Sequence, residues 1–227
     1  MRMEFHQDCD AVVDLPSTPA KRIMVLNPNT SSRITELLRR AALKAAPPDC
    51  AIVARSVAAG PAALREAADL GVAEREVLAV VRTQTDLDGL VISAFGDPGF
   101  EKTQAAAGFP VVGLGASGMT AAEALGQFVI LTLGPQMDKH LRARVSQLGL
   151  AGHLIGIRFL EADIPDVAEA PERFLSEIKA QAEVAAAQGA QALLLGGAPF
   201  TGLGHLVRAP IPVIDGLRAA FDQLLAR

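Results

Sequence analysis

The feature that most constrains the fold of this chain is a unit that occurs twice along the sequence. Each copy has an apolar run followed by a loop and a helical stretch, then an apolar run that leads into glycine and proline, then a proline-led apolar run. The matching segments are 23–26 with 128–133, Leu90–Gly99 with Leu193–Gly202, and Phe109–Gly113 with Ile211–Asp215. Two copies of one unit predict two similar halves related by a pseudo-two-fold axis.

Short apolar runs alternate with helical patterns from Arg22 onward. The expected strands are 23–26, 50–54, 89–95, 110–114, 127–133, 153–159, 192–195 and 211–214. The expected helices are one that Thr30–Ser32 caps and Pro47 ends, then 61–70 and 72–85 split near Gly71, 117–125, 137–148, 171–188 and 216–226. This alternation predicts an α/β protein of two Rossmann-like lobes, each with a parallel sheet and right-handed crossovers. We expect residues 21–117 with 210–227 in one lobe, 118–209 in the other, and 1–20 as a loose extension.

Composition supports a large core and excludes several classes of partner. Half of the residues are hydrophobic while Tyr and Trp are absent, so we expect an aliphatic core with nine Phe. The net charge is −4 and no run of Lys or Arg occurs, which makes nucleic acid and membrane surfaces poor candidate partners. No apolar stretch approaches the roughly 18 residues of a membrane span, and the acidic N-terminus is unlike a signal peptide. We therefore expect a cytoplasmic protein.

The loops that follow the expected strands form the candidate ligand site. In open α/β sheets, ligands bind beyond the carboxyl ends of the strands. These loops are 27–31, 93–99, 115–118, 134–135, 196–202 and 215–216, and a two-fold arrangement makes them face one another. Backbone N–H groups and hydroxyls of Asn27–Ser31, at the start of a helix, suit an anion or a carbonyl group. The same hydroxyls also suit ordinary helix capping.

Several of these segments together are similar to one enzyme superfamily. The segments are Val25–Ser31, Val91–Gly99, Pro110–Gly113, Leu195–Ala198 and Pro212–Asp215. In this order, from about Arg22 to the C-terminus, the chain resembles the Asp/Glu/hydantoin racemase superfamily, and hydantoin racemase is the branch that it resembles most. The resemblance implies two Rossmann-like lobes, an active site between them, no cofactor and no metal.

The chain departs from this family at the two positions that matter most for racemisation. Family racemases carry one cysteine after each of two equivalent strands, where one thiolate removes a proton and the other thiol returns it on the opposite face. Here these positions are Ala94 and Gly197, and neither can carry a proton. Cys50 opens an expected strand at the end opposite the ligand loops, and Cys9 lies in the extension. Two-thiol racemisation is therefore excluded unless Cys9 or Cys50 substitutes.

Three other groups remain as candidates for catalysis. Asp97, in a Gly-Asp-Pro-Gly turn near Ala94, is a candidate acid or base, and the alternative is a carboxylate that caps its own turn. His205 is a candidate general base near neutral pH, with a surface histidine as the alternative. Ser93 is the third candidate, although strand alternation points it to the other face of the sheet.

The candidate substrate-binding residues come from the same loops of both halves. They are Asn27, Asn29, Thr30, Ser31, Ala94, Phe95, Ser117, Gly118, Gly197, Ala198 and Thr201. For Ser117 and Thr201 the alternative is helix or turn capping. His140 and His153 are interpreted as structural, and Asp215 as a residue that fixes the junction between the lobes.

Two classes of function are compatible with this sequence. The first is a cofactor-independent isomerase or lyase that acts on a small carboxylate or cyclic ureide by proton transfer or decarboxylation, without the two-cysteine mechanism. The second is a non-catalytic small-ligand binder, or an inactive homologue of hydantoin racemase. Alanine-rich helices such as 171–188 favour self-association, so we expect a homo-oligomer.

Overall fold

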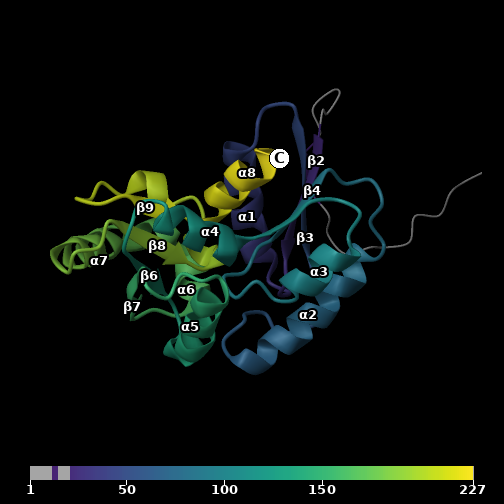
Figure 1. The fold of residues 1–227 in the computed structure, drawn as a ribbon. Coiled ribbons are helices and arrows are strands. Elements are labelled where there is room, and N and C mark those ends of the chain that lie inside the picture. Colours follow the sequence, from purple (N-terminus) through teal and green to yellow (C-terminus); the bar gives the residue numbers. More distant parts are fainter. Residues whose placement is uncertain (1–11, 15–20, 227) are drawn as a thin grey trace, which may run out of the picture.

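The computed structural model describes residues 12–14 and 21–226, and its strands form two sheets (Figure 1). In the first sheet, four parallel strands lie in the order β3–β2–β4–β5, and β1 adds to β3 antiparallel. In the second, four parallel strands lie in the order β7–β6–β8–β9. The strands are β1 Val12–Asp14, β2 Lys21–Asn27, β3 Cys50–Ser56, β4 Gly89–Ile92, β5 Val111–Gly113, β6 Phe128–Thr132, β7 Leu154–Phe159, β8 Ala192–Gly196 and β9 Val213–Asp215. The shared order of the parallel strands confirms the predicted α/β fold of two similar lobes.

Strand pairing fixes which residues of the two halves correspond. Leu90 lies opposite Val111 in the first sheet, and Leu193 lies opposite Val213 in the second. Ala94 stands four residues after Leu90, as Gly197 stands four residues after Leu193. The two positions that the sequence singles out are therefore equivalent in the structure.

Helices cover both faces of the sheets. They are α1 Ser32–Ala45, α2 Ala67–Val81, α3 Phe100–Ala106, α4 Leu114–Glu123, α5 Asp138–Gln147, α6 Ile164–Glu169, α7 Leu175–Ala187 and α8 Gly216–Leu225. The face of the first sheet that carries Met24 and Leu26 packs against Val77 and Val80 of α2. The opposite face packs against α1 and α8, and its core is continuous with the second half. No helix among the described residues is long and apolar enough to cross a bilayer.

The last helix of each half packs against the sheet of the other half. Helix α4 follows β5 but contacts β8 and β9, whereas α8 follows β9 but contacts β4 and β5. The contacts are close, because a Cβ on Gly89 would lie 2.6 Å from Leu224 Cδ2 and one on Gly118 would lie 2.8 Å from Leu194 Cδ1. The two helices lie side by side at the centre of the molecule (Figure 1). The division into 21–117 with 210–227 and 118–209 stays a prediction, since β9 joins the second sheet while α8 covers the first.

One local prediction was wrong, and three short elements were not expected. No helix break occurs at Gly71, because α2 runs through it, and residues 61–66 form a loop. Glycine is tolerated there because Gly71 is exposed while Leu70, Ala73 and Val77 of the same helix are buried. The short helices α3 and α6 were not expected, since each has too few turns for a clear apolar period. Val12–Asp14, expected in a loose extension, pairs with β3, and the rest of 1–20 lies outside the described residues.

Candidate functional site

The carboxyl ends of the strands from both halves enclose one inner cavity of about 80 Å³. Ala94, after β4, and Gly197, after β8, both line it. Phe95 and Ala198 line it as well, and the Phe95 ring crosses to the other half, since a Cβ on Gly196 would lie 2.7 Å from its Cε1. The two halves therefore contribute equivalent strand ends to a single space.

The polar side chains that line this cavity are neutral. They belong to Asn29, Ser93 and Thr132, and no ionisable side chain is among the described residues that line it. Ser93 Oγ donates to the carbonyl of Val91 at 3.2 Å, and Thr132 Oγ1 donates to the carbonyl of Gly196 at 2.5 Å. Ser93, directly after β4, is fully buried and already hydrogen-bonded, as a serine with a structural role would be.

Asn27 organises the loop that precedes α1. Its buried Nδ2 donates to Asn29 Oδ1 at 2.9 Å and to Thr35 Oγ1 at 3.0 Å. Asn29 Oδ1 also accepts from the backbone N–H of Ser31 at 2.9 Å. Asn29 Nδ2 has no hydrogen-bond partner within the described part of the chain, and Asn29 lines the cavity. Asn29 is therefore the member of this loop that offers a free donor to a bound molecule.

The other predicted residues of that loop lie further out. Thr30 is exposed, and its backbone N–H donates to the carbonyl of Pro61 at 3.1 Å. Ser31 lines a larger cleft outside the cavity, and its Oγ accepts from the backbone N–H of Ile34 at 3.3 Å as the cap of α1. Helix capping, the alternative that the sequence left open, accounts for the Ser31 hydroxyl.

Backbone amides at the cavity add to the donors. Within the described residues, the N–H groups of Ala94, Phe95, Gly96 and Gly197 have no hydrogen-bond partner. All four residues line the cavity. Three of them follow β4 and one follows β8, so both halves contribute free N–H groups. Successive free N–H groups of this kind form seats for anionic oxygen.

Asp97 lies outside the cavity and binds the start of α4. Its Oδ1 accepts from the backbone N–H of Gly115 at 2.8 Å, and its Oδ2 accepts from that of Ala116 at 2.7 Å. Burial raises the pKa of the Asp97 carboxyl to about 7, against the opposing effects of Arg144 and the two N–H groups. Arg144 of α5 lies 3.5 Å from Asp97 Oδ2 and 2.5 Å from Glu101 Oε1, so an ion-pair cluster joins the two halves behind the cavity.

The remaining candidates are also away from the cavity. His205 is exposed and lines a separate surface groove with Ser117 and Asp215. Ser117 Oγ donates to Gln223 Oε1 at 2.6 Å, and its neighbour Gly118 packs on Leu194. Thr201, which is 8% exposed, borders another surface depression.

Asp215 and Cys50 make structural contacts and do not line the cavity. Asp215 accepts from the backbone N–H groups of Leu217, at 2.9 Å, and Gly202, and burial raises its pKa. Cys50 opens β3 at the opposite end of the sheet, and burial raises the pKa of its thiol. Cys9 lies outside the described residues. Within residues 12–14 and 21–226, no three His, Cys, Asp or Glu side chains gather as a metal ion requires.

His140, interpreted from the sequence as structural, stands directly behind the cavity wall. It is on α5 between Met137 and Leu141, which both line the cavity. Its Nε2 is buried and has no partner in the described part of the chain. A Cβ on Gly96, itself a lining residue, would lie 3.3 Å from this nitrogen. The spacing of residues 137, 140 and 141 places them on one face of a helix, which was the available signal for His140. The sequence did not show that this face meets the cavity.

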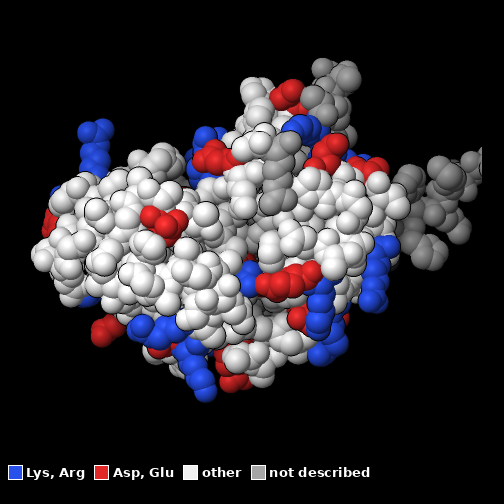
Figure 2. Space-filling model, in the orientation of Figure 1, with Lys and Arg blue, Asp and Glu red and all other residues white. Residues whose placement is uncertain are grey.

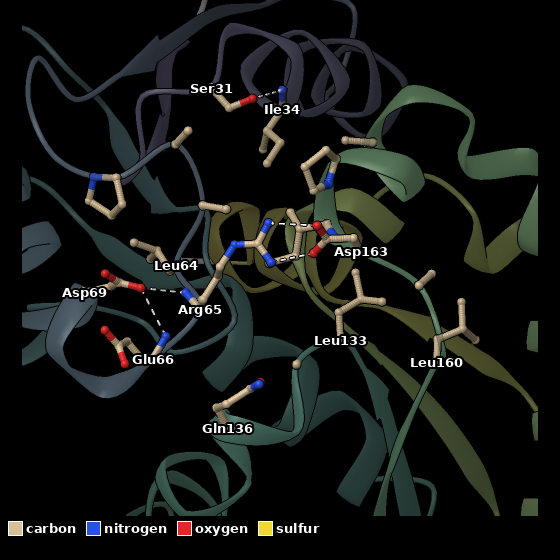
Figure 3. Close-up of a pocket in the computed structure, with 18 of the residues that line it drawn as sticks. Ser31, Ile34, Leu64, Arg65, Glu66, Asp69, Leu133, Gln136, Leu160 and Asp163 are labelled. Carbon is tan, nitrogen blue, oxygen red and sulfur yellow. Dashed lines mark hydrogen bonds and ion pairs between the residues drawn. The ribbon is translucent and has the colours of Figure 1, made fainter.

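A larger cleft of about 1090 Å³ lies outside the cavity. Both spaces are bordered by an apolar collar, made of Ile34, Ala63, Leu64, Leu133 and Ile164. Beyond the collar, Arg65 of the 61–66 loop and Asp163 at the start of α6 point toward each other and form a two-pronged ion pair (Figure 3). The sequence did not indicate this pair, because its members are 98 residues apart and come from two different halves.

The comparisons with known proteins agree with this architecture. The family model described as Asp/Glu/Hydantoin racemase matches residues 23–224. The chain therefore belongs to the Asp/Glu/hydantoin racemase family, as the sequence motifs indicated.

Individual proteins similar to this chain include hydantoin and allantoin racemases. Hydantoin racemase of Paenarthrobacter aurescens is 29% identical over 206 residues, which cover 88% of this chain and 87% of the relative. Among solved structures, allantoin racemase from Klebsiella pneumoniae superposes with a TM-score of 0.85 at 28% identity, covering 91% of this chain and 87% of that one. Allantoin racemase from Pseudomonas fluorescens gives a TM-score of 0.84 at 25% identity, covering 90% and 89%.

Proposed function

We propose that this chain is a cofactor-independent isomerase or lyase that acts on a cyclic ureide or small carboxylate in the inner cavity, without a pair of cysteines. One observation carries the proposal. Equivalent strand ends of both halves meet at a single cavity that offers free backbone N–H groups and the Asn29 amide, while Ala94 and Gly197 supply no proton-carrying group. The similarity to hydantoin and allantoin racemases supports cyclic ureides as the first compounds to test.

The donors around the cavity suit the charge that such reactions develop. Removing a proton, or CO₂, from the carbon beside a carbonyl group leaves an enolate-like oxyanion. The free N–H groups of Ala94, Phe95, Gly96 and Gly197 are preorganised donors for that oxygen. Donors that are fixed before the reaction stabilise developing charge without a reorganisation cost, and one such donor is typically worth about 3–4 kcal/mol.

The proton acceptor in this proposal is His140. Its unpartnered Nε2 is buried directly behind Gly96, a residue that lines the cavity. A neutral imidazole can take a proton from a carbon near neutral pH and return it to the same carbon. A single base on one face supports hydrogen exchange or protonation after decarboxylation, rather than inversion by two bases.

Ligand binding without chemistry is the second candidate function. It is favoured by the neutral lining of the cavity, since no ionisable side chain among the described residues borders it. In that case the same donors hold a ligand and no proton moves.

An NMR experiment in deuterated water separates the two candidates. The protein is incubated with hydantoin, 5-substituted hydantoins, allantoin, aspartate, glutamate and arylmalonates, while C–H exchange and CO₂ release are followed and calorimetry measures binding. We expect exchange that His140→Gln lowers by about 100-fold or more, the usual contribution of a general base, with affinity retained. His153→Gln, which alters a half-exposed imidazole beside Glu123, is the matched control and should keep the activity.

Each outcome decides between the candidates. Binding without exchange supports the non-catalytic function and contradicts the enzyme. Exchange that survives in His140→Gln removes His140 from the mechanism. Neither binding nor exchange with any compound of the panel would overturn the proposal.

A further inference from the structure

We propose that Arg65 and Asp163 select the substituent of the ligand, and that they favour a short neutral group that both donates and accepts hydrogen bonds, such as an amide or a urea. This inference rests on the proposed binding of a cyclic ureide in the inner cavity. The ring occupies the cavity, the carbon chain crosses the apolar collar, and the polar group reaches the ion pair in the outer cleft.

The layered lining of the site is the first support. The inner cavity has about 80 Å³ and neutral walls, whereas the outer cleft has about 1090 Å³ and a charged rim. Between them stands the apolar collar, to which the loop before α2 contributes Leu64 and the start of α6, in the other half, contributes Ile164. A molecule that fills this path has a small polar head, a short apolar link and a polar end.

The positions of Arg65 and Asp163 are the second support, because both are fixed by neighbouring backbone. The backbone N–H groups of Arg65 and Glu66 donate to Asp69 Oδ2 at 2.7 Å and 3.1 Å, which holds the loop before α2 (Figure 3). Asp163 Oδ1 accepts from the backbone N–H of Ile164 at 3.0 Å as the cap of α6. The donor and the acceptor therefore stand ready on opposite sides of the cleft.

The ion pair itself is easily exchanged for contacts with a ligand. The side chains of Arg65 and Asp163 are 51% and 54% exposed, and exposed ion pairs contribute little to stability. A carbonyl oxygen can accept from the guanidinium while an N–H group of the same substituent donates to the carboxylate. An alkyl group inserted at this point would leave both charges without a partner, which disfavours it.

The charge of the outer cleft disfavours an anionic substituent. Among the described residues that line it, five are acidic and two are arginines. One of these arginines, Arg33, already pairs with Glu169 at 3.0 Å. A carboxylate on the ligand would gain Arg65 but would be repelled by Asp163 and its acidic neighbours.

Binding of matched hydantoins tests the selection. Calorimetry compares hydantoin with its 5-carbamoylmethyl, 5-carboxymethyl and 5-propyl derivatives, which differ mainly in charge and hydrogen bonding. We expect the carbamoylmethyl compound to bind about tenfold or more tightly than the other two substituted rings. Asp163→Asn keeps the cap of α6 and should improve binding of the carboxymethyl compound by about tenfold, while Arg65→Gln should abolish the preference for the amide.

Two further variants serve as controls. Arg33→Gln removes a cleft arginine outside the pair and should leave the order of affinities unchanged. The exchange Arg65→Asp with Asp163→Arg rebuilds the pair in reverse and should recover part of the preference for the amide. All variants should bind unsubstituted hydantoin as the unaltered protein does.

The outcomes distinguish this inference from the proposed function. If hydantoin binds but the substituted rings bind equally well, only the role of Arg65 and Asp163 is overturned. Equal losses for hydantoin and its derivatives in the variants would also overturn it, because they indicate a general disturbance of the cleft. Absence of binding by every ring overturns both proposals.

Discussion

At the scale of single residues, each half places a carboxylate at the start of its last helix, α4 or α8. The two carboxylates come from different segments, the loop after β4 in the first half and the end of β9 in the second. Asp97 reaches from the loop after β4 to the N–H groups that open α4. Asp215 stands at the end of β9, opens α8 and reaches back to Gly202. Gly113 is the register equivalent of Asp215, and a Cβ there would lie 2.4 Å from Asp97 Oδ1. Glycine at 113 is therefore required by the carboxylate that comes from the other side.

The two family cysteine positions also differ in what they tolerate. We predict that Gly197→Cys lowers the free energy of unfolding by about 1–3 kcal/mol. Residue 197 has φ 138° and ψ 146°, a backbone conformation that is strained for any residue with a side chain. Ala94→Cys should be nearly neutral, since φ at Ala94 is not positive. Urea unfolding measures both.

Gly197→Ala is the control for this prediction. It should lose as much stability as Gly197→Cys, because the cost lies in the backbone and the nearest atom to a Cβ there is 3.5 Å away. Equal stability of Gly197→Cys and Ala94→Cys would contradict it.

At the scale of elements, the start of α2 decides the shape of the cleft. Pro61 to Glu66 were expected in a helix, but Asp69 accepts from the N–H groups of Arg65 and Glu66 and so fixes the helix start six residues later, at Ala67. Residues 61–66 therefore form a loop. Ala63 and Leu64 of this loop lie in the collar, and Arg65 lines the outer cleft. A shift of a few residues in one helix boundary therefore supplies much of one wall of the outer cleft.

Helix α2 also gives a stability prediction. Gly71→Ala should raise the free energy of unfolding by about 0.5–1 kcal/mol, because glycine in an exposed helix interior loses more backbone entropy than alanine. No atom lies within 4 Å of a Cβ at that position. Thermal unfolding measures the change. Gly99→Ala is the opposite control, since φ is 72° and its Cβ would lie 2.9 Å from Glu74 Cγ, so it should destabilise.

At the scale of the whole molecule, two sets of contacts join the halves. Helices α4 and α8 each pack on the sheet of the other half, and Arg144 forms ion pairs with Asp97 and Glu101. The Arg144 guanidinium also lies 5.4 Å from the centre of the Phe100 ring. These contacts surround the back of the cavity, so the relative position of the halves fixes the distance between the strand ends. Over the face in Figure 2, acidic and basic side chains are interspersed rather than gathered by sign.

This junction predicts a pH dependence of stability. The pKa of Asp97 is raised from an ordinary 3.8 to about 7, so the folded protein binds more protons than the unfolded chain between these values. Stability should therefore fall as pH rises from about 4 to about 7, by up to about 1.4 kcal/mol per pH unit, and the effect should level off above that range.

Asp97→Asn isolates this contribution. The variant should be less stable, because it loses one acceptor at the start of α4, but its stability should lack this slope. Urea unfolding at pH 5, 6, 7 and 8 compares the two proteins. The same slope in both would show that other groups cause it.

The sequence by itself determined the parallel α/β architecture, the duplication and the family, because these depend on apolar runs, turn residues and a repeat that are local in the chain. The residues near Ala94 and Gly197 could also be predicted, since carboxyl ends of parallel strands collect at one edge. Only the tertiary structure decided which groups reach the cavity: it took Asp97 to a helix start and His205 to the surface, and it brought His140 behind Gly96. It also paired Arg65 with Asp163. Side-chain direction and contacts between distant segments depend on how the two halves pack, and no local pattern in the chain encodes that packing.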